Sequence, residues 1–233
     1  MLSILTLGFL IGMRHALEAD HVAAVASLAS GSKNIRETVF HGAVWGLGHT
    51  VALMVIGTIV IVMNSTVPET IAHWLEFTVG IMLVLLGADV IRRMIRDRVH
   101  FHFHRHASAK HAHLHAHSHR GEGKHTSSSH EHTHNKGLTA RVLAVGIMHG
   151  MAGSAALVLL VAGSITSTIT AVLYIALFGF GSIVGMAALS AAIAVPLRYS
   201  AKSMTWAYNS LQVIVGIGTM SLGIYTMYSL GLA

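Results

Sequence analysis

The sequence predicts an all-α fold, a polytopic membrane helical bundle of six spans arranged as an inverted repeat of three plus three. Three observations predict it. The first is composition: of 233 residues, 53% are hydrophobic and only 10% are charged, whereas about 25% of the residues of a soluble domain are charged. The mean hydropathy is +0.64. The second is a series of apolar stretches of spanning length, and the third is a set of short motifs that return at nearly one offset.

Each span is predicted from an apolar stretch long enough to cross the hydrocarbon core, which takes about 20 residues in a helix. Short polar segments and one long histidine-rich segment separate these stretches. We therefore expect the chain to cross the membrane six times. In chain order the stretches are Leu2–Leu28, Thr38–Met63, Trp74–Ile91, Val142–Ile165, Ile169–Val195 and Trp206–Leu230.

Internal similarity divides the spans into two halves, with three motifs repeated at offsets of 133 to 136 residues. The alternative is chance, because small residues are common wherever membrane helices meet. With three spans per half, the second half is inverted, as in many secondary transporters whose site lies near the midplane. The expected division is 1–97 for the first repeat, 98–138 for the loop and 139–233 for the second repeat. The motifs are GMRH (Gly12–His15) with GIMH (Gly146–His149), GLGHTV (Gly46–Val51) with GFGSIV (Gly179–Val184), and VGIMLVLLG (Val79–Gly87) with VGIGTMSLG (Val215–Gly223).

Basic residues indicate which ends of the spans face the cytoplasm. They follow the first, third and fifth spans, whereas the loops after the second and fourth spans have none. Because cytoplasmic loops carry the excess of Lys and Arg, we expect a multi-pass plasma-membrane protein with both termini outside and the histidine-rich loop in the cytoplasm. The net charge of +6 then reflects topology and not nucleic-acid binding. The basic residues that follow these spans are Lys33, Arg36, ten Lys or Arg residues from Arg92 to Arg141, Arg198 and Lys202, and Arg14 is the only other one.

Histidine dominates the long loop, which holds thirteen of the nineteen histidines between His100 and His134. The loop is polar and low in complexity, which predicts disorder. Alternating histidines on a flexible chain bind divalent late transition metals, since imidazole suits zinc, copper, nickel and iron. The alternative is a solvated, pH-sensitive linker. The composition favours metal capture without indicating which metal.

The first span contains a cluster of ionisable residues in GMRHALEADHVAAV (Gly12–Val25). Each such group at the centre of a spanning helix costs about 2.5–3.5 kcal/mol on insertion scales, and such residues mark functional sites. In a regular helix His15, Glu18 and His21 lie within about 120° of one another, while Asp20 points elsewhere. Gathering all four side chains therefore requires local unwinding or a second helix.

Histidines also fall within the other apolar stretches: His41 and His49 in the second and His149 in the fourth. A single intramembrane histidine is often a hydrogen bond between helices, but five histidines together with carboxylates favour a polar site. Gly48 and Gly150, each next to a histidine, allow close helix approach. The chain has no cysteine, so metal ligands here are imidazole, carboxylate, thioether, backbone or water.

These motifs resemble those of the nickel/cobalt transporter family. RHALEADHVAAV resembles the family's H-x-x-x-x-D-H signature, GLGHTV its L-G-H-[ST]-x-V motif, and GIMHGMAGSAALVLLV a segment of the short, urease-accessory-like or high-affinity nickel transport branch. The chain departs from the family at Glu18, where the signature usually has Asp. The resemblance implies a metal-site role for His15, Asp20, His21 and His49, and for His149. Together with the other polar side chains of the spans, the candidate metal ligands are His15, Glu18, Asp20, His21, His41, His49 and His149.

The predicted function is transmembrane transport of Ni²⁺ or Co²⁺, with uptake favoured over export. The ion is the transported substrate, and no catalytic cofactor is expected. The expected partners are the divalent ion, the lipid bilayer and a cytoplasmic metallochaperone. Alternatives are an exporter, a membrane-bound metallochaperone or accessory protein for a metalloenzyme, and a membrane enzyme. The last is disfavoured because the sequence shows no recognisable nucleophile or nucleotide-binding motif.

Overall fold

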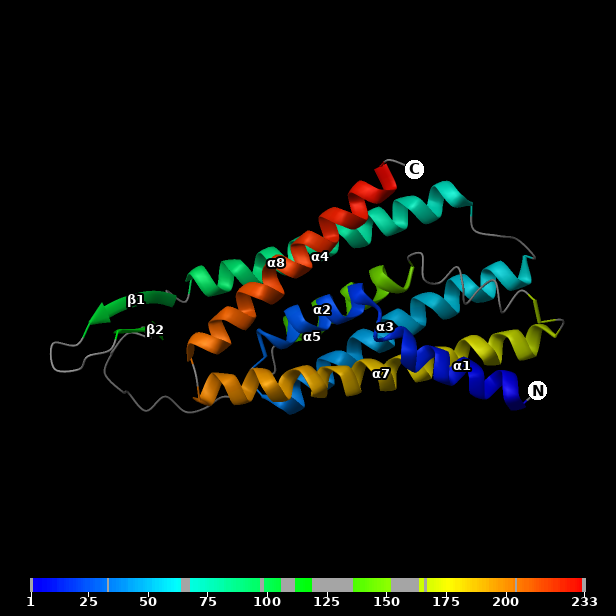
Figure 1. Ribbon diagram of the computed structural model, residues 1–233. Helices are drawn as coiled ribbons and strands as arrows, with labels where there is room; N and C mark the ends of the chain where they lie inside the picture. Colours follow the sequence, from blue (N-terminus) through cyan, green and yellow to red (C-terminus); the bar gives the residue numbers. More distant parts are fainter. Residues whose placement is uncertain are drawn as a thin grey trace.

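A computed structural model describes residues 2–32, 34–63, 68–96, 99–105, 112–118, 136–151, 164–165, 167–203 and 205–231. Within these residues the chain forms seven helices and one pair of strands (Figure 1). The elements are α1 (Leu2–His15), α2 (Ala19–Ala29), α3 (Ile35–Val62), α4 (Glu69–Arg96), β1 (Val99–Arg105), β2 (Ala112–Ser118), α5 (Lys136–Gly150), α7 (Thr168–Ser203) and α8 (Thr205–Gly231).

Four helices, α3, α4, α7 and α8, are long and apolar enough to cross a membrane. The first predicted span is broken: α1 and α2 meet at 56° and qualify as a span only together. The fourth predicted span is described only in part, because α5 ends at Gly150 and residues 152–163 lie outside the described residues. The helical bundle is thus confirmed with four long spans, or five if the bent pair counts as one.

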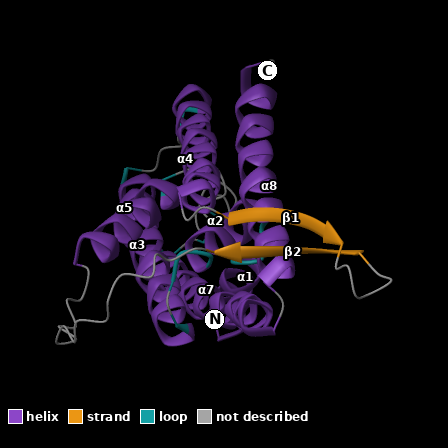
Figure 2. Cartoon of the chain, turned by 90° about the vertical axis from the view of Figure 1, so that its left-hand side faces the viewer, coloured by secondary structure: helices purple, strands orange, loops and turns teal. Residues whose placement is uncertain are grey.

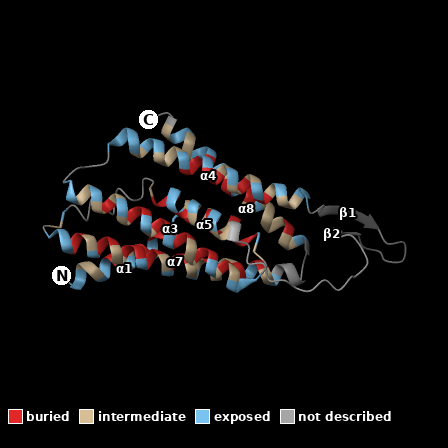
Figure 3. Cartoon of the chain, turned by 180° about the vertical axis from the view of Figure 1, so that it is seen from behind, coloured by how far each residue is buried: buried red, intermediate tan, exposed pale blue. Residues whose placement is uncertain are grey.

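The surface of the bundle is apolar, as expected for helices that face lipid. Buried residues concentrate on the faces where helices meet, and the outward faces are exposed (Figure 3). On α4 and α8 these outward faces carry Leu85, Ile214 and Tyr225, each about two thirds exposed. Large exposed apolar surface is rare on soluble monomers, so the chain is a membrane protein.

The helices pack as two groups. α1 and α3 both lie along α7, and α5 lies along α3, while α4 and α8 lie side by side next to this group (Figures 1 and 2). The short α2 lies between the groups and contacts α7, α8 and α4. Between these helices the His21 side chain of α2 is fully buried, and the Asp20 side chain is 30% exposed.

Two matching glycine contacts hold α1 to α7 and α5 to α3. A Cβ at Gly12 would overlap the carbonyl of Phe178, and a Cβ at Gly146 would overlap the carbonyl of Trp45. Gly12 and Gly146 differ by 134 positions, and Trp45 and Phe178 by 133. The same kind of contact thus occurs twice at the offset of the sequence motifs.

The α4–α8 pair also has matching glycine contacts, here made in both directions. A Cβ at Gly80 would lie 2.9 Å from the carbonyl oxygen of Gly223, and a Cβ at Gly87 would lie 2.6 Å from that of Gly216. Gly80 and Gly216 are equivalent in the third repeated motif, as are Gly87 and Gly223. Small residues let membrane helices approach closely, and here they do so reciprocally.

Within the histidine-rich loop the structure describes two short strands. β1 and β2 form a two-stranded antiparallel sheet in which His100, His102 and His104 pair with His117, His115 and His113. The physical reason is the strict alternation of histidine with other residues, which has the period of a strand. The rest of the loop, 106–111 and 119–135, lies outside the described residues.

Candidate metal centre

The break between α1 and α2 separates the two histidines of the first motif. After His15 the chain makes two tight hydrogen bonds, from the backbone N–H of Leu17 to the carbonyl of Arg14 (2.9 Å) and from that of Glu18 to the carbonyl of His15 (3.0 Å). Glu18 is extended, with φ −65° and ψ 149°, and α2 starts directly after it. This is the local unwinding that Asp20 required in order to join the histidines.

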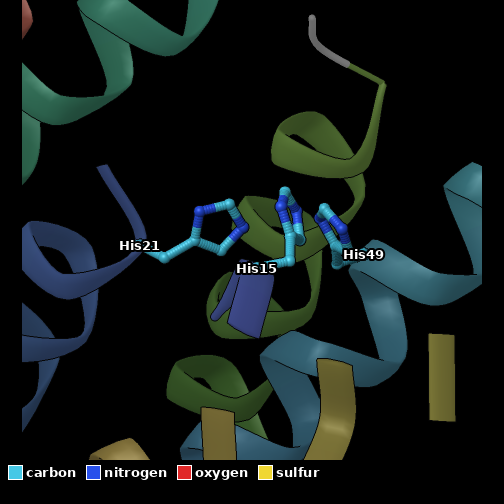
Figure 4. Close-up of side chains that lie close together, drawn as sticks. All are labelled: His15, His21 and His49. Carbon is cyan, nitrogen blue, oxygen red and sulfur yellow. The ribbon is translucent and has the colours of Figure 1, made fainter. Parts of the chain in front are cut away.

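Three histidines converge at the break, His15 at the end of α1, His21 on α2 and His49 on α3 (Figure 4). One ring nitrogen of each lies within 4.8 Å of those of the other two. The ring centres are 4.4 Å apart for His15 and His21, and 5.2 Å apart for His15 and His49. All three side chains are buried. This spacing suits three ligands of one metal ion.

A second ligand group shares His21 with the first. Asp20 Oδ1 lies 2.9 Å from His21 Nδ1, and Asp20 Oδ2 lies 3.0 Å from His149 Nε2. The carboxylate therefore bridges two imidazoles that are 128 positions apart in the chain, with ring centres separated by 4.1 Å. The sequence suggested all three residues, but nothing in it indicated that Asp20 would join α2 to α5.

Glycines on α5 and α3 allow His149 to reach the cluster. A Cβ at Gly150 would overlap the carbonyl of His49, and a Cβ at Gly48 would lie 2.5 Å from the carbonyl oxygen of Leu143. The Trp45 ring lies 5.5 Å from the His21 ring and 5.4 Å from the His149 ring, centre to centre. The close contact of α3 and α5 and the tryptophan together position the second group.

Several buried nitrogens of the cluster have no hydrogen-bond partner within the described part of the chain: His21 Nε2, His149 Nδ1 and both ring nitrogens of His49. A buried polar group left unpaired costs about 1–3 kcal/mol. Neutral imidazole nitrogens of this kind are the atoms that bind divalent transition metals. The donor set of imidazoles and one carboxylate fits a metal ion, which would satisfy these nitrogens.

Glu18 and His41 stand apart from both ligand groups. Glu18 is 48% exposed, and its Oε1 lies 2.9 Å from His15 Nδ1, so it orients that ring. His41 is buried two turns before His49 on α3, where it lines a small cavity with Thr38 and Ser190. Neither residue belongs to a ligand group among the described residues.

An arginine that sequence reasoning missed holds the far end of α2. Arg93 donates from Nη2 to the carbonyl of Ser27 (3.1 Å) and to Oγ of Ser30 (3.3 Å), and its Nε lies 3.3 Å from Asp89 Oδ2. Cations are favoured at a helix C-terminus, where carbonyls lack partners. Arg93 thereby ties α2, which carries Asp20, to α4.

Polar side chains of α8 and α7 reach the same end of α2. Ser27 Oγ lies 3.0 Å from Thr219 Oγ1, and Arg198 donates to the carbonyl of Ser32. Tyr208 and Gln212 both donate to the carbonyl of Ser30, each at 3.4 Å. We call these groups and Arg93 the α2 clamp. The only sequence signal for it was the position of its arginines at the ends of spans.

Replacing Gly150 by Ala is expected to separate α5 from α3 and to weaken the contact between Asp20 and His149. The added methyl group would overlap the His49 backbone, which cannot turn away like a flexible side chain. Overpacking of this kind costs about 1–3 kcal/mol. Thermal unfolding in detergent measures it. The matched control is Gly218→Ala on α8, which has no atom within 4 Å of its Cβ position; equal melting temperatures for the two variants would contradict the contact.

Comparison with known proteins places these features in a family. The model of the NicO family, described as high-affinity nickel-transport proteins, matches residues 1–232. The chain is 36% identical over 232 residues to the urease accessory protein UreH of Bacillus sp. (strain TB-90), covering 99% of this chain and 93% of that protein.

Two chloroplast proteins of Arabidopsis thaliana, FOR GROWTH AND FERTILITY 1 and 2, are 23% and 26% identical over 220 residues. The match covers 91% of this chain, which spans 57% and 54% of their lengths. No solved structure matches the chain significantly. Because the family match covers nearly every residue and the bacterial relative is similar over most of its length, the chain belongs to the NicO family of high-affinity nickel-transport proteins.

Proposed function

We propose that this chain carries Ni²⁺, and also Co²⁺, into the cell through an intramembrane site built from histidine and aspartate. The observation that carries the proposal is the Asp20 carboxylate between His21 and His149, joined through His21 to His15 and His49. Imidazole and carboxylate ligands without thiolates suit Ni(II) and Co(II). The family match supports nickel as the substrate.

The two overlapping ligand groups suggest how an ion moves. Because His21 belongs to both, an ion held by His15, His21 and His49 passes to Asp20, His21 and His149 without losing all its ligands. Asp20 supplies the negative charge that offsets part of the ion's charge in a low-dielectric interior. Glu18 orients His15 and can join its ligand set, and His41 is a later contact nearer the hairpin.

We also propose an inverted repeat, with 1–97 and 139–233 as halves and 98–138 as the connecting loop. It is supported by contacts that correspond between the halves: α1 of the first half packs on α7 of the second, and α5 of the second half packs on α3 of the first. Ring contacts correspond in the same way, since Phe178 lies 5.2 Å from His15 and Trp45 lies 5.4 Å from His149. Inverted repeats with a central site on broken helices are typical of secondary transporters.

The proposed topology has both termini outside the plasma membrane and the histidine-rich loop in the cytoplasm. Both termini lie at one end of the bundle, and the hairpin lies at the other (Figure 1). Arg93 and Arg198 of the α2 clamp lie at the hairpin end of their helices, in keeping with the positive-inside rule.

Single cysteines test this topology, since the chain has none of its own. Leu2→Cys and Ile169→Cys are expected to react with an impermeant maleimide in intact cells. Ile35→Cys and Ile95→Cys are expected to react only after the membrane is opened. All four positions are exposed (78%, 74%, 41% and 68%). Labelling of Ile95→Cys in intact cells would reverse the orientation.

The hairpin gives the cytoplasmic loop a defined role in the proposal. Its register pairs His100, His102 and His104 with His117, His115 and His113, and imidazole is a ligand of divalent late transition metals. The loop then collects ions that leave the site and offers them to a cytoplasmic metallochaperone.

An accessory role is the second candidate, because the bacterial relative is named a urease accessory protein. Export is the third. We infer no enzymatic activity. Cells expressing the chain at low external ⁶³Ni²⁺ separate these roles: uptake predicts more cell-associated nickel than vector controls, and export predicts less. Unchanged nickel content with improved activation of a nickel enzyme would favour the accessory role.

Deleting residues 101–134 is expected to lower nickel accumulation in the cells only when the external nickel concentration is low.

A further inference from the structure

Ser182 lies on the face of α7 that points at the metal centre. One row of α7 packs on α1, because Cβ atoms at Gly181 and Gly185 would meet backbone atoms of Phe9 and Met13. Each residue advances the direction of its side chain around the helix axis by about 100°. With the direction of Phe178 taken as 0°, the two glycines of this row and Phe178 lie between about 300° and 0°. The direction of Ser182 is about 40°.

A second row of α7 packs on α3. A Cβ added at Gly179 would overlap the side chain of Thr50, and Ile183 lies against Gly46. These positions fall at about 100° and 140° on the same scale. Ser182 therefore points between the rows, into the seam between α1 and α3. His15 and His49 lie in this seam, with ring centres 5.2 Å apart.

The height of Ser182 along α7 also matches the metal centre. Phe178, one turn before it, has its ring 5.2 Å from the His15 ring. On α3, Gly46 lies against Ile183 and Thr50 against Gly179, so His49 is level with the residues between them. Ser182 is one of those residues.

The hydroxyl of Ser182 is buried without a partner. The residue is 0% exposed, and its Oγ has no hydrogen bond within the described part of the chain. A buried serine in a helix usually bonds a carbonyl one turn back, as Thr219 does to Val215 on α8 (2.7 Å). An unpaired hydroxyl costs about 1–3 kcal/mol, which indicates a use other than packing.

The repeat gives Ser182 a counterpart in the first half. In GLGHTV and GFGSIV it is the position equivalent to His49, while His15 is equivalent to His149. Ring contacts agree with this equivalence, because Phe178 contacts His15 and Trp45, its counterpart in the first half, contacts His149. Ser182 thus occupies, in the second half, the place that a metal-ligand candidate occupies in the first.

We propose that Ser182 is a further metal-contacting position, supplying to the ion beside His15 and His49 a hydroxyl oxygen that holds it less tightly than a histidine at this position would. The inference rests on the proposed function. A neutral oxygen binds late transition metals more weakly than imidazole nitrogen does. A transport site must bind firmly enough to admit an ion and weakly enough to release it. One oxygen ligand among the imidazoles therefore makes release of the ion easier.

Initial rates of Ni²⁺ entry into proteoliposomes holding the full chain test this role. Ser182→Ala is expected to raise KM about tenfold, the effect typical of losing one supporting group at a metal site. Ser182→Thr keeps the hydroxyl and is expected to stay near wild type. Ser182→His, with a second imidazole, is expected to lower both KM and kcat, because tighter binding slows release.

Thr170→Ala is the matched control, because Thr170 is a buried hydroxyl residue near the start of the same helix, α7. Equal KM for Ser182→Ala and Thr170→Ala would overturn the inference, as would a Ser182→Thr variant as impaired as Ser182→Ala. His49→Ala separates the two levels of the proposal. If His49→Ala abolishes entry while Ser182→Ala is normal, only the role of Ser182 fails. If the wild-type chain admits no Ni²⁺, the proposed function fails with it.

Discussion

Asp20→Asn is expected to abolish nickel transport while leaving the protein in the membrane at its normal level. The substitution keeps the size of the side chain but removes the charge between His21 and His149. Replacing a group that only supports a metal ligand lowers the metal affinity of a site about 10–100-fold. Replacing a direct ligand should lower it at least as much. Removing an intramembrane charge should also ease insertion.

The measurement is ⁶³Ni²⁺ entry into proteoliposomes, corrected for the amount of protein. Glu69→Gln is the control, since it removes an exposed carboxylate at the start of α4. His21→Ala and His149→Ala are expected to be about as damaging as Asp20→Asn. If Asn at position 20 lowers transport only as far as it lowers expression, Asp20 serves helix packing and not the ion.

Arg93→Gln is expected to release α2 from the rest of the bundle. The guanidinium donates to the carbonyl of Ser27 and to Ser30 at the end of the helix that carries Asp20. Hydrogen bonds to charged groups contribute about 1.5–3 kcal/mol each, and glutamine cannot reach both partners. We expect a lower melting temperature and a loss of transport larger than the loss of folded protein.

Arg92→Gln provides the comparison, because Arg92 is the adjacent arginine and is exposed. It should leave both melting temperature and transport close to wild type. Identical behaviour of the two variants would show that the α2 clamp does not position the metal centre.

Much of the fold could be predicted because lipid restricts the choices. A spanning segment must satisfy its own backbone hydrogen bonds, so the long apolar stretches around Trp45, Leu83, Phe178 and Ile217 could only be helices. The break after His15 could not be placed, since no proline or glycine occupies residues 15–21 and α1 and α2 read as one apolar run. The pairing of β1 with β2 was not predicted, although the alternation of histidine is visible in the sequence.

The candidate site was predicted residue by residue but not in its arrangement. Ionisable side chains in apolar stretches are costly, so His15, Asp20, His21, His49 and His149 stood out individually. Their grouping depends on helix contacts between residues more than a hundred positions apart, made by glycines that look alike in the sequence. An uncharged residue such as Ser182, which we propose as a further contact, carries no comparable signal in the sequence.

The most direct test of the central claim is the nickel K-edge X-ray absorption spectrum of the chain without residues 101–134, loaded with one equivalent of Ni²⁺. Removing the loop leaves the intramembrane histidines as the main imidazoles. We expect imidazole scattering from more than one histidine. The scattering should be reduced in His21→Ala, because His21 belongs to both ligand groups, and unchanged in His73→Ala, because His73 is exposed. A spectrum of hydrated Ni²⁺, or one unaffected by His21→Ala, would contradict a metal site at these histidines.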